Sequence, residues 1–223
     1  MSIFSVIKKV NLWKTLYFNF RYLPFTKAIH FPVYIYWRSD LSKMRGKLII
    51  DAPVTAGMIK FGVHSLGHQD SFFNRTKWDV RGTVVFKGEA RIGRGSKICV
   101  GRGATLTLGD GFDLTGASEI ICQKEITFGS QCLLSWDILI MDTDFHHVLN
   151  AEDQIINSPK PITIGNHVWI GCRNTILKGV SVADDTIISA NSTITRSITE
   201  PHCAVAGHGR HLDILKSPVT WTL

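Results

Sequence analysis

Aliphatic side chains recur at every sixth position between residues 164 and 194. The members of this series are Ile164, Ile170, Ile176, Val182, Ile188 and Ile194. A six-residue period matches neither the 3.6-residue turn of an α-helix nor the simple alternation of a β-strand. It indicates a coil of short parallel strands, each ended by a turn, with the aliphatic side chains stacked in layers inside. Glycine follows the first two members, at turn positions that favour a positive φ.

The same frame continues upstream with one interruption. It contains Val80, Phe86, Ile92, Ile98 and Ala104 and, after the interruption, Phe128, Leu134 and Ile140. In between, the frame falls on Asp110 and Gly116. There the apolar signal moves four residues further on, to Leu108, Leu114, Ile120 and Ile126. The 24 positions from Ile140 to Ile164 are a multiple of six, so the phase survives the polar segment between them. Coils of this kind stabilise their neighbours and need several repeats in series.

These residues carry a family resemblance. Residues 161–198, PITIGNHVWIGCRNTILKGVSVADDTIISANSTITRSI, resemble the hexapeptide-repeat acyltransferases, the left-handed parallel β-helix family. Residues 143–148, TDFHHV, resemble the histidine-bearing loop of the sugar and polysaccharide O-acetyltransferases in that family. The resemblance covers about residues 80–210. It implies an all-β, left-handed parallel β-helix with three flat faces, an N-terminal α-helical or irregular extension and an extruded catalytic loop.

The resemblance divides the chain into three parts. Residues 1–47 form a basic amphipathic N-terminal extension, residues 48–210 the left-handed β-helix acyltransferase domain, and residues 211–223 a C-terminal tail. Repeats are clear from about residue 80, and the extruded loop covers about residues 141–160. The resemblance also implies a homotrimer, in which the loop of one subunit reaches the cleft against its neighbour.

The net charge of +7 is unevenly distributed. Residues 1–47 contain nine Lys or Arg residues and one acidic residue, Asp40, which gives +8 and leaves −1 for the rest of the chain. This distribution argues against a nucleic-acid-binding surface along the whole chain. The five cysteines are odd in number and form no Cys-x-x-Cys pair, so we interpret them as small buried side chains in a reducing compartment.

Apolar residues in the first twenty positions have near-helical spacing. They are Ile3, Val6, Ile7, Val10, Trp13, Leu16, Tyr17 and Phe20, with lysines and Asn11 on the other side. No apolar run reaches the ~18 residues of a membrane span, and the lysines interrupt any signal-peptide core. Two interpretations stay open: residues 1–20 dock on an anionic membrane, or the apolar face packs on the protein itself or on another subunit. The expected location is cytoplasmic, with or without peripheral contact at the inner membrane surface.

Acyl transfer to a hydroxyl requires a base, and histidine suits this role near neutral pH. His146 matches the family pattern Ser/Thr-Asp-x-His over residues 143–146 and is the candidate base. His147 is the alternative, because residues 147–150 can be aligned with a His-Pro-Leu-Asp pattern instead. Asp144 is the nearest candidate to orient the imidazole. Further acidic residues close by are Asp142, Glu152 and Asp153.

The resemblance implies acetyl-CoA as co-substrate and assigns six residues to its site. They are Trp169, Gly171, Cys172, Ala190, Thr195 and Arg196. The tryptophan would lie beside the coenzyme, the next three would offer backbone groups to the pantetheine arm, and the last two would lie near the phosphates, with which a guanidinium pairs well. On structure alone, Trp169 could equally be an outward aromatic residue in a subunit contact. Residues 205–210, VAGHGR, replace the family pattern Ala/Val-Gly-Asn-Pro-Ala.

A three-histidine metal site, as in the carbonic-anhydrase branch of this fold, is the main rival chemistry. That branch carries a His-x4-His pair in its repeats, whereas the nearest pattern here is His64 and His68, outside them. No metal is therefore expected. His167 can be a simple outward-facing strand residue. Three histidines after the last repeat could line a subunit interface: His202, His208 and His211.

The predicted function is transfer of an acetyl group from acetyl-CoA to a hydroxyl of a sugar or glycan precursor. Two alternatives stay open: a non-catalytic β-helix that serves as a scaffold or binding protein, and an N-acetyltransferase that acts on an amino sugar. The expected partners are further copies of the chain, the glycan acceptor and, through residues 1–20, an anionic membrane, with no nucleic acid among them. The residues leave the acceptor and the length of the acyl chain open.

Overall fold

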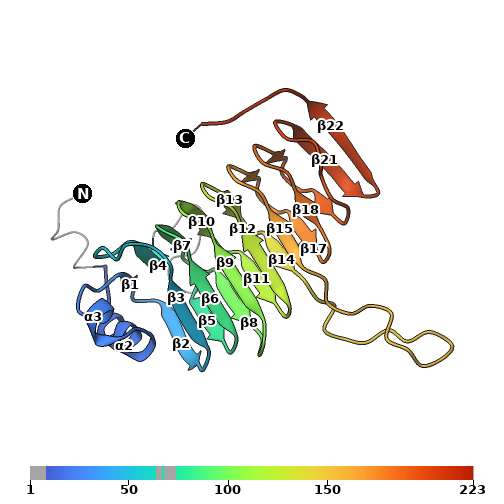
Figure 1. Cartoon of the computed structure of the whole chain (residues 1–223). Coiled ribbons are helices and arrows are strands. Elements are labelled where there is room, and N and C mark those ends of the chain that lie inside the picture. Colours follow the sequence, from blue (N-terminus) through green and yellow to red (C-terminus); the bar gives the residue numbers. More distant parts are fainter. Residues whose placement is uncertain (1–8, 64–66, 68–73, 223) are drawn as a thin grey trace.

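The computed structural model describes residues 9–63, 67 and 74–222, and these residues form a parallel β-helix. Each strand from β1 to β17 is hydrogen-bonded in parallel to the strand three places further along the chain. Three successive strands therefore make one coil, and the coils stack into a prism with three faces (Figure 1). We name these faces A, B and C in the order in which the chain meets them.

The strands of each face lie at intervals of three along the chain. Face A contains β1 (Val33–Ile35), β4 (Ile59–Val63), β7 (Ala90–Gly93), β10 (Phe112–Gly116), β13 (Leu133–Trp136), β16 (Trp169–Ile170) and β19 (Ile187–Ile188). Face B contains β2 (Ser39–Met44), β5 (Thr76–Val80), β8 (Lys97–Val100), β11 (Glu119–Cys122), β14 (Leu139–Met141), β17 (Thr175–Leu177) and β20 (Thr193–Ile194). Face C contains β3 (Lys47–Ile50), β6 (Thr83–Phe86), β9 (Thr105–Leu108), β12 (Glu125–Phe128), β15 (Ile162–Ile164) and β18 (Ser181–Val182).

A C-terminal hairpin closes the last coil. Strand β21 (Ala204–Gly209) pairs in parallel with both β19 and β20 and so joins faces A and B. Strand β22 (His211–Lys216) runs antiparallel to β21 along its outer edge. The predicted tail of residues 211–223 thus contains a strand.

The six-residue series forms the core of the prism. Within each coil, three members spaced six apart supply one buried side chain to each face. These triplets are Phe86, Ile92 and Ile98; Leu108, Leu114 and Ile120; Phe128, Leu134 and Ile140; Ile164, Ile170 and Ile176; and Val182, Ile188 and Ile194. All fifteen are at most 3% exposed. Burying each such side chain stabilises the fold by about 1.5–3 kcal/mol.

The interruption of the frame has a geometric cause. Successive triplets are joined at the edge where the chain passes from face B to face C, which we call the B–C edge. The joining steps are 10 residues from Ile98 to Leu108, 8 from Ile120 to Phe128, 24 from Ile140 to Ile164 and 6 from Ile176 to Val182. The first two joints are four and two residues longer than the regular step. Because these additions sum to six, the later triplets return to the original frame.

The first coil begins upstream of the predicted boundary at residue 48. Strands β1, β2 and β3 pair in register with β4, β5 and β6. The six-residue spacing does not reveal this coil, because β2 and β4 carry irregularities in their register. Among the described residues, two short helices precede the prism: α2 (Leu12–Tyr22) and α3 (Phe25–Ala28).

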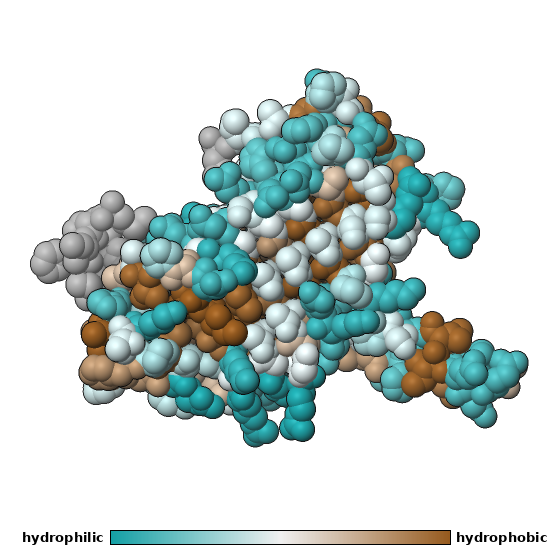
Figure 2. All heavy atoms as spheres, in the orientation of Figure 1, coloured by the Kyte–Doolittle hydropathy of each residue, from teal (hydrophilic) through white to brown (hydrophobic). Residues whose placement is uncertain are grey.

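Helix α2 packs on the first coil through a face different from its predicted apolar face. Phe18 lies against Trp78, with ring centroids 5.3 Å apart, and Asn19 bonds both the N–H and the C=O of Val33. The predicted apolar face points outward, with Trp13 81% and Tyr17 59% exposed. It forms part of a hydrophobic area over α2 in Figure 2. Ile3, Val6 and Ile7 lie outside the described residues.

No helix among the described residues is both long and apolar enough to cross a membrane. The five cysteines are all free thiols. Three of them are buried, Cys122, Cys132 and Cys203, and the other two are partly exposed.

Candidate active site

An extruded segment leaves the prism at the B–C edge between β14 and β15 (Figure 1). Its starting point is fixed by the fully buried carboxylate of Asp142. This carboxylate accepts hydrogen bonds from the backbone N–H groups of Gln123, Lys124 and Glu125 on the preceding coil, at 2.6, 2.7 and 2.8 Å. Asp142 therefore has a structural role and is not available to a histidine.

The outer part of the segment is a narrow hairpin. Leu149 forms an antiparallel bridge with Ile155, and the Ile156 N–H donates to the Val148 carbonyl at 2.9 Å. Asn150 closes the tip by accepting hydrogen bonds from two backbone N–H groups. Five apolar side chains of the segment are about half exposed or more: Phe145, Val148, Leu149, Ile155 and Ile156.

Asn157 holds the root of the hairpin to the histidine-bearing turn. Its amide donates to the Asp144 carboxylate and to the His146 carbonyl, both at 2.8 Å, and its side-chain oxygen accepts from the Val148 N–H at 2.7 Å. Lys178, at the end of β17, donates to both the Asp144 carboxylate and the Asn157 carbonyl. The extruded segment is thereby tied to the coil that follows it.

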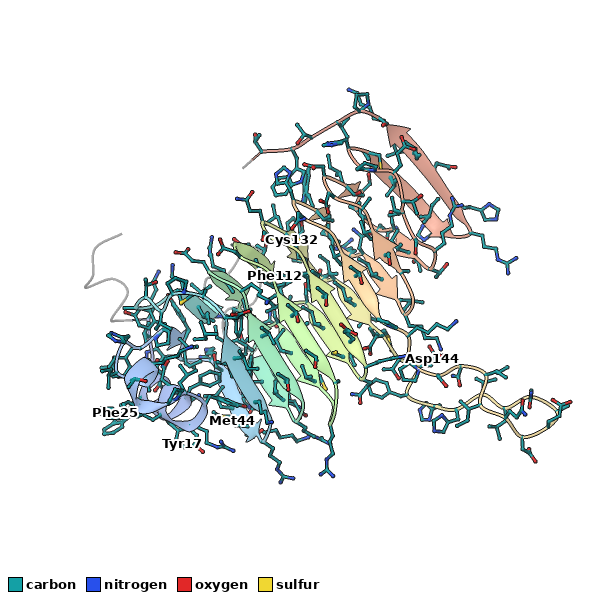
Figure 3. The ribbon with its side chains drawn as sticks, in the orientation of Figure 1. Tyr17, Phe25, Met44, Phe112, Cys132 and Asp144 are labelled. Carbon is teal, nitrogen blue, oxygen red and sulfur yellow. The ribbon has the colours of Figure 1, made fainter. Side chains whose placement is uncertain are left out.

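Asp144 lies at the root of the extruded segment (Figure 3). The Lys178 ammonium, and after it the Asn157 amide, hold the pKa of the Asp144 carboxyl below its usual range. Sequence reasoning placed Asp144 against an imidazole, whereas its partners in the single chain are Lys178 and Asn157.

His146 and His147 are both exposed. Within the described part of the chain, neither imidazole makes a hydrogen bond, although the backbone around His146 is well fixed. Phe145, which precedes it, has a φ of +62° and donates its N–H to the Thr143 hydroxyl at 3.0 Å. A left-handed conformation is costly for a bulky residue and is often found at functional sites. The turn thus presents His146 on a fixed backbone with a free imidazole.

The residues assigned to the donor site fall into two groups. Trp169, Gly171, Cys172 and Ala190 lie on face A and on the edge between faces A and B. The indole of Trp169 is 37% exposed and donates to the Ser135 hydroxyl at 3.4 Å. The Gly171 N–H donates to the Ile188 carbonyl of the next coil, so it is not free to bind the coenzyme in this structure.

Thr195 and Arg196 follow β20 at the B–C edge, the edge that carries His146. The Arg196 guanidinium donates to the Leu212 carbonyl of the C-terminal hairpin at 2.7 Å. The single chain therefore places Trp169 and His146 on different parts of the prism, and it does not bring the whole predicted site together.

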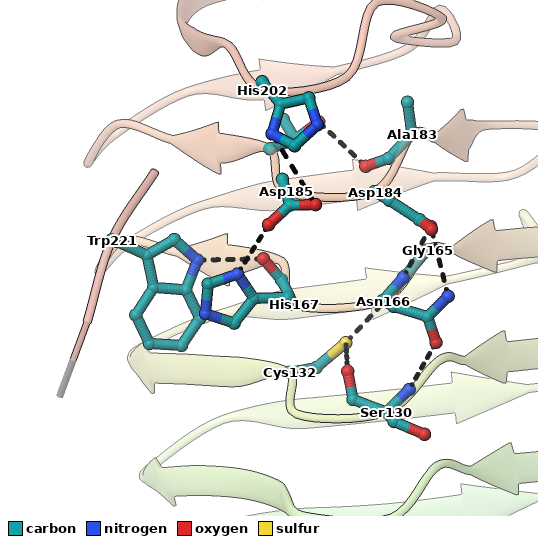
Figure 4. A network of polar contacts seen from close by, with 11 residues as sticks. Ser130, Cys132, Gly165, Asn166, His167, Ala183, Asp184, Asp185, His202 and Trp221 are labelled. Carbon is teal, nitrogen blue, oxygen red and sulfur yellow. Dashed lines mark hydrogen bonds and ion pairs between the residues drawn. The ribbon is translucent and has the colours of Figure 1, made fainter. Parts of the chain in front are cut away.

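A polar and aromatic cluster lies where the chain passes from face C to face A (Figure 4). His167 has a φ of +53° in the turn before β16, and its Nδ1 is 2.7 Å from an Asp185 carboxylate oxygen. Trp221 stacks on the His167 ring at 4.3 Å and donates its indole N–H to the His167 carbonyl at 2.8 Å. His202 lies 3.7 Å from the same aspartate. His167 is thus part of an anchor for the C-terminus, a role that its spacing alone did not suggest.

No group of three or more His, Cys, Asp or Glu residues in the described chain is placed to hold a metal ion. His64 and His68 lie outside the described residues. Burial raises the pKa of the Cys132 thiol to about 11, which makes it a poor nucleophile near neutral pH.

Sequence reasoning did not find a hollow at the B–C edge, below the extruded segment. Its volume is about 590 Å³, and its lining includes Arg45, Arg81, Arg102, Cys99 and Phe145. The three arginines of this hollow share one feature in the sequence: each stands beside a glycine, at 45–46, 81–82 and 101–103.

Comparison with known proteins follows the repeats. Residues 161–196 match the family described as bacterial transferase hexapeptide (six repeats). Over 98 residues, 43% of its length, the chain is 34% identical to galactoside O-acetyltransferase of Escherichia coli (strain K12), covering 45% of that protein. Over 137 residues, 60% of its length, it is 31% identical to polysialic acid O-acetyltransferase of Escherichia coli O1:K1 / APEC, covering 41% of that protein. The chain thus spans less than half the length of these two curated relatives.

Among solved structures, the crystal structure of the polySia specific acetyltransferase NeuO has a TM-score of 0.50 at 24% identity, over 86% of this chain and 79% of that one. This likeness confirms the predicted left-handed parallel β-helix fold. In its repeat sequence and in its fold, the chain is similar to the hexapeptide-repeat sugar O-acetyltransferases.

Proposed function

We propose that the protein transfers an acetyl group from acetyl-CoA to a hydroxyl of a sugar or glycan. The observation that carries this proposal is the fixed turn that presents His146 at the root of an extruded segment, in a chain whose curated relatives include galactoside and polysialic acid O-acetyltransferases. A non-catalytic scaffold would have no need of a clamped turn with a free imidazole.

His146 acts as the general base. It takes the proton from the acceptor hydroxyl as the oxygen attacks the thioester carbonyl, and it returns the proton to the sulfur as the carbon–sulfur bond breaks. The products are the O-acetyl ester and the free thiol of CoA, so no covalent enzyme intermediate is required. Asn157 and Lys178 keep the turn in position. Asp144 contributes by accepting hydrogen bonds from both of these side chains. His147 is the alternative base.

The donor site lies between two copies of the chain. Trp169, Cys172 and Ala190 supply one wall, and the B–C edge of a neighbouring copy supplies His146. This arrangement accounts for the separation of the two groups in one chain. Thr195 and Arg196 lie on the B–C edge with the histidine, where they face the phosphates of the coenzyme. Gly171 contributes by its lack of a side chain, because a Cβ there would lie 2.8 Å from the Ala190 nitrogen.

The assembly is a homotrimer. The apolar side chains of the extruded hairpin are exposed in the single chain, and Figure 2 shows hydrophobic residues on this projection. Exposed apolar patches of this kind commonly mark protein contacts. Light scattering should give the mass of three chains, and Leu149→Glu with Ile156→Glu should reduce it to that of one.

The outward face of α2 docks on an anionic membrane. Trp13, Tyr17 and Phe20 are exposed there, with Lys9 and Arg21 beside them. Aromatic residues flanked by cations suit the interface of an anionic bilayer. In a sedimentation assay with anionic vesicles, replacing the three aromatic residues by serine should keep the protein in the supernatant. Equal pelleting of both forms would contradict this contact.

Release of CoA thiol in the presence of sugar acceptors tests the activity. His146→Ala should abolish the release and leave the melting shift caused by CoA intact, a stabilisation of roughly 2.7 kcal/mol at a hundredfold excess over Kd. His147→Ala is the matched control and should retain activity. A CoA-induced shift without thiol release from any sugar would favour a binding protein, and loss of activity only in His147→Ala would transfer the role of base to that residue.

A further inference from the structure

The hollow at the B–C edge has an unusual excess of positive charge. Its charged lining consists of Arg45, Arg81, Arg102 and one acid, Asp79. Asp79 is buried and lies 3.5 Å from the Arg81 guanidinium and 3.1 Å from the Lys43 ammonium. Among the described residues, the guanidinium groups of Arg45 and Arg102 have neither an acidic partner nor a hydrogen bond.

A second hollow along the other edge of face B shows that this excess is not a general property of the surface. That hollow, of about 400 Å³, is also lined by three cations, but two of them have acidic partners. Arg75 lies 3.7 Å from Asp40, and Lys97 pairs with Glu119. Of these two hollows in the described part of the chain, the one at the B–C edge contains two arginines without a carboxylate partner.

The three arginines stand on consecutive coils. The Arg45 N–H donates to the Val80 carbonyl, the Arg81 N–H to the Val100 carbonyl, and the N–H of Gly101, which precedes Arg102, to the Cys122 carbonyl. Neighbouring parallel strands lie about 4.8 Å apart, so the backbones that carry the three arginines repeat at an interval close to the length of one sugar residue in an extended glycan. A linear chain with one anionic group per sugar would therefore match the row.

The glycines beside the arginines let the coils that carry them stack closely. A Cβ at Gly46 would lie 2.1 Å from the Gly82 carbonyl oxygen, and a Cβ at Gly82 would lie 2.2 Å from that of Gly101. Only glycine fits at these positions, because each lies directly against the backbone of the next coil, so the coils that carry the arginines stack closely. Phe145, which immediately precedes His146, also lines the hollow.

We propose that the arginine row of Arg45, Arg81 and Arg102 binds a linear anionic glycan and delivers one of its hydroxyl groups to His146. This inference rests on the proposed function and specifies its acceptor as a chain with carboxylate or phosphate groups. Guanidinium groups bind both anions through paired, charge-assisted hydrogen bonds. Such binding weakens as salt screens the charges.

Fluorescence anisotropy of labelled oligosaccharides tests the binding separately from catalysis. The probes are a hexamer of galacturonate, a hexamer of ribitol phosphate and, as the neutral reference, maltohexaose, each at 50 and 200 mM NaCl. We expect the full-length protein to bind at least one anionic hexamer about tenfold or more tightly than maltohexaose, with weaker binding at the higher salt. The preferred probe identifies the anionic group. Equal binding of all three hexamers would overturn the proposal.

The decisive variant is Arg45→Gln with Arg102→Gln, which removes the two unpaired guanidinium groups from exposed positions. The control is Arg91→Gln with Lys97→Gln, which removes the same charge from face A and from the opposite edge of face B. The first variant should lose about tenfold or more in affinity for the anionic hexamer, and the control should keep it. Equal loss in both would mean that net charge alone is responsible and would overturn the site. If a neutral sugar supports thiol release while anionic hexamers do not bind, the acetyltransferase activity would be supported, and the arginine row would be rejected as the acceptor site.

Discussion

The interior of the prism and its B–C edge differ in how strongly the fold constrains their sequence. Inside the five coils from Phe86 to Ile194, a buried aliphatic or aromatic side chain recurs on every face, six residues apart within each coil. At the B–C edge, the same chain adds four, two and eighteen residues to successive coils without disturbing that spacing. Residues at the edge do not pack in the layers of the core. The number of residues at the edge can therefore vary with little loss of stability. The interior thus determines the fold, and the B–C edge is free to carry the chemistry.

The largest expected effect lies in the interior. Leu134 is fully buried on β13, whereas its neighbour Leu133 points outward from the same strand. Leu134→Ala should lower the free energy of unfolding by about 2–5 kcal/mol, because it removes buried methyl groups and leaves a cavity. Leu133→Ala is the control and should cost much less. Urea denaturation of both variants measures the difference, and similar losses would show that the inward and outward positions are not distinct.

The next largest effect on stability is expected at Asp142, where the B–C edge meets the interior. Asp142→Ala would leave the N–H groups of residues 123–125 without the carboxylate that they share. An unsatisfied buried polar group costs about 1–3 kcal/mol, so we expect a loss in unfolding free energy of roughly 2–3 kcal/mol. Asp144→Ala, on the exposed side of the same turn, should change the unfolding free energy by less than about 0.5 kcal/mol. Equal effects would contradict a structural role for Asp142.

The sequence predicted the interior far better than the edge, for a physical reason. An inward position requires an apolar side chain of suitable size, so Ile164 to Ile194 reveal the coil directly. At the edge, by contrast, function depends on contacts between residues far apart in the chain. The Asn157 clamp and the partner of Asp144 at the B–C edge have no periodic signal, and neither has the stacking of Trp221 on His167 between faces C and A. The arginine row became visible only when the coils brought three distant positions together.

A smaller effect, on activity alone, tests the edge. Asn157→Ala removes three hydrogen bonds that fix the turn around His146. A displacement of about 1 Å at a reacting group can cost on the order of 10²-fold in rate. We therefore expect kcat for thiol release to fall about that much, with little change in melting temperature. Asn150→Ala, at the tip of the same segment, is the matched control. If both variants lost activity equally, the whole extruded segment would be needed for activity, and the hydrogen bonds of Asn157 would have no specific role in positioning His146.

The smallest effect concerns the pH range over which the edge stays ordered. Lys178 and Asn157 lower the pKa of Asp144, so the folded carboxyl binds a proton less readily than the unfolded one. The stabilisation that this group gives to the turn is then fully present above its ordinary pKa, near 4, and is lost as the pH falls through the lowered value. The protection of residues 143–157 against hydrogen exchange, corrected for the intrinsic exchange rate, should stay constant from pH 8 down to about 4. Below that pH the protection should decline.

Lys178→Gln sharpens this last test, because it removes the largest cause of the lowered pKa. The loss of protection below about pH 4 should then be smaller, because the folded and unfolded carboxyls differ less in their affinity for a proton, and it should be confined to the extruded segment. Protection of the inward-facing strands β13 and β16 should not change, since their buried side chains Leu134 and Ile170 are apolar. If protection of the strands declined together with that of the segment, the B–C edge and the interior would form one cooperative unit, and the independence of chemistry from fold in this molecule would be lost.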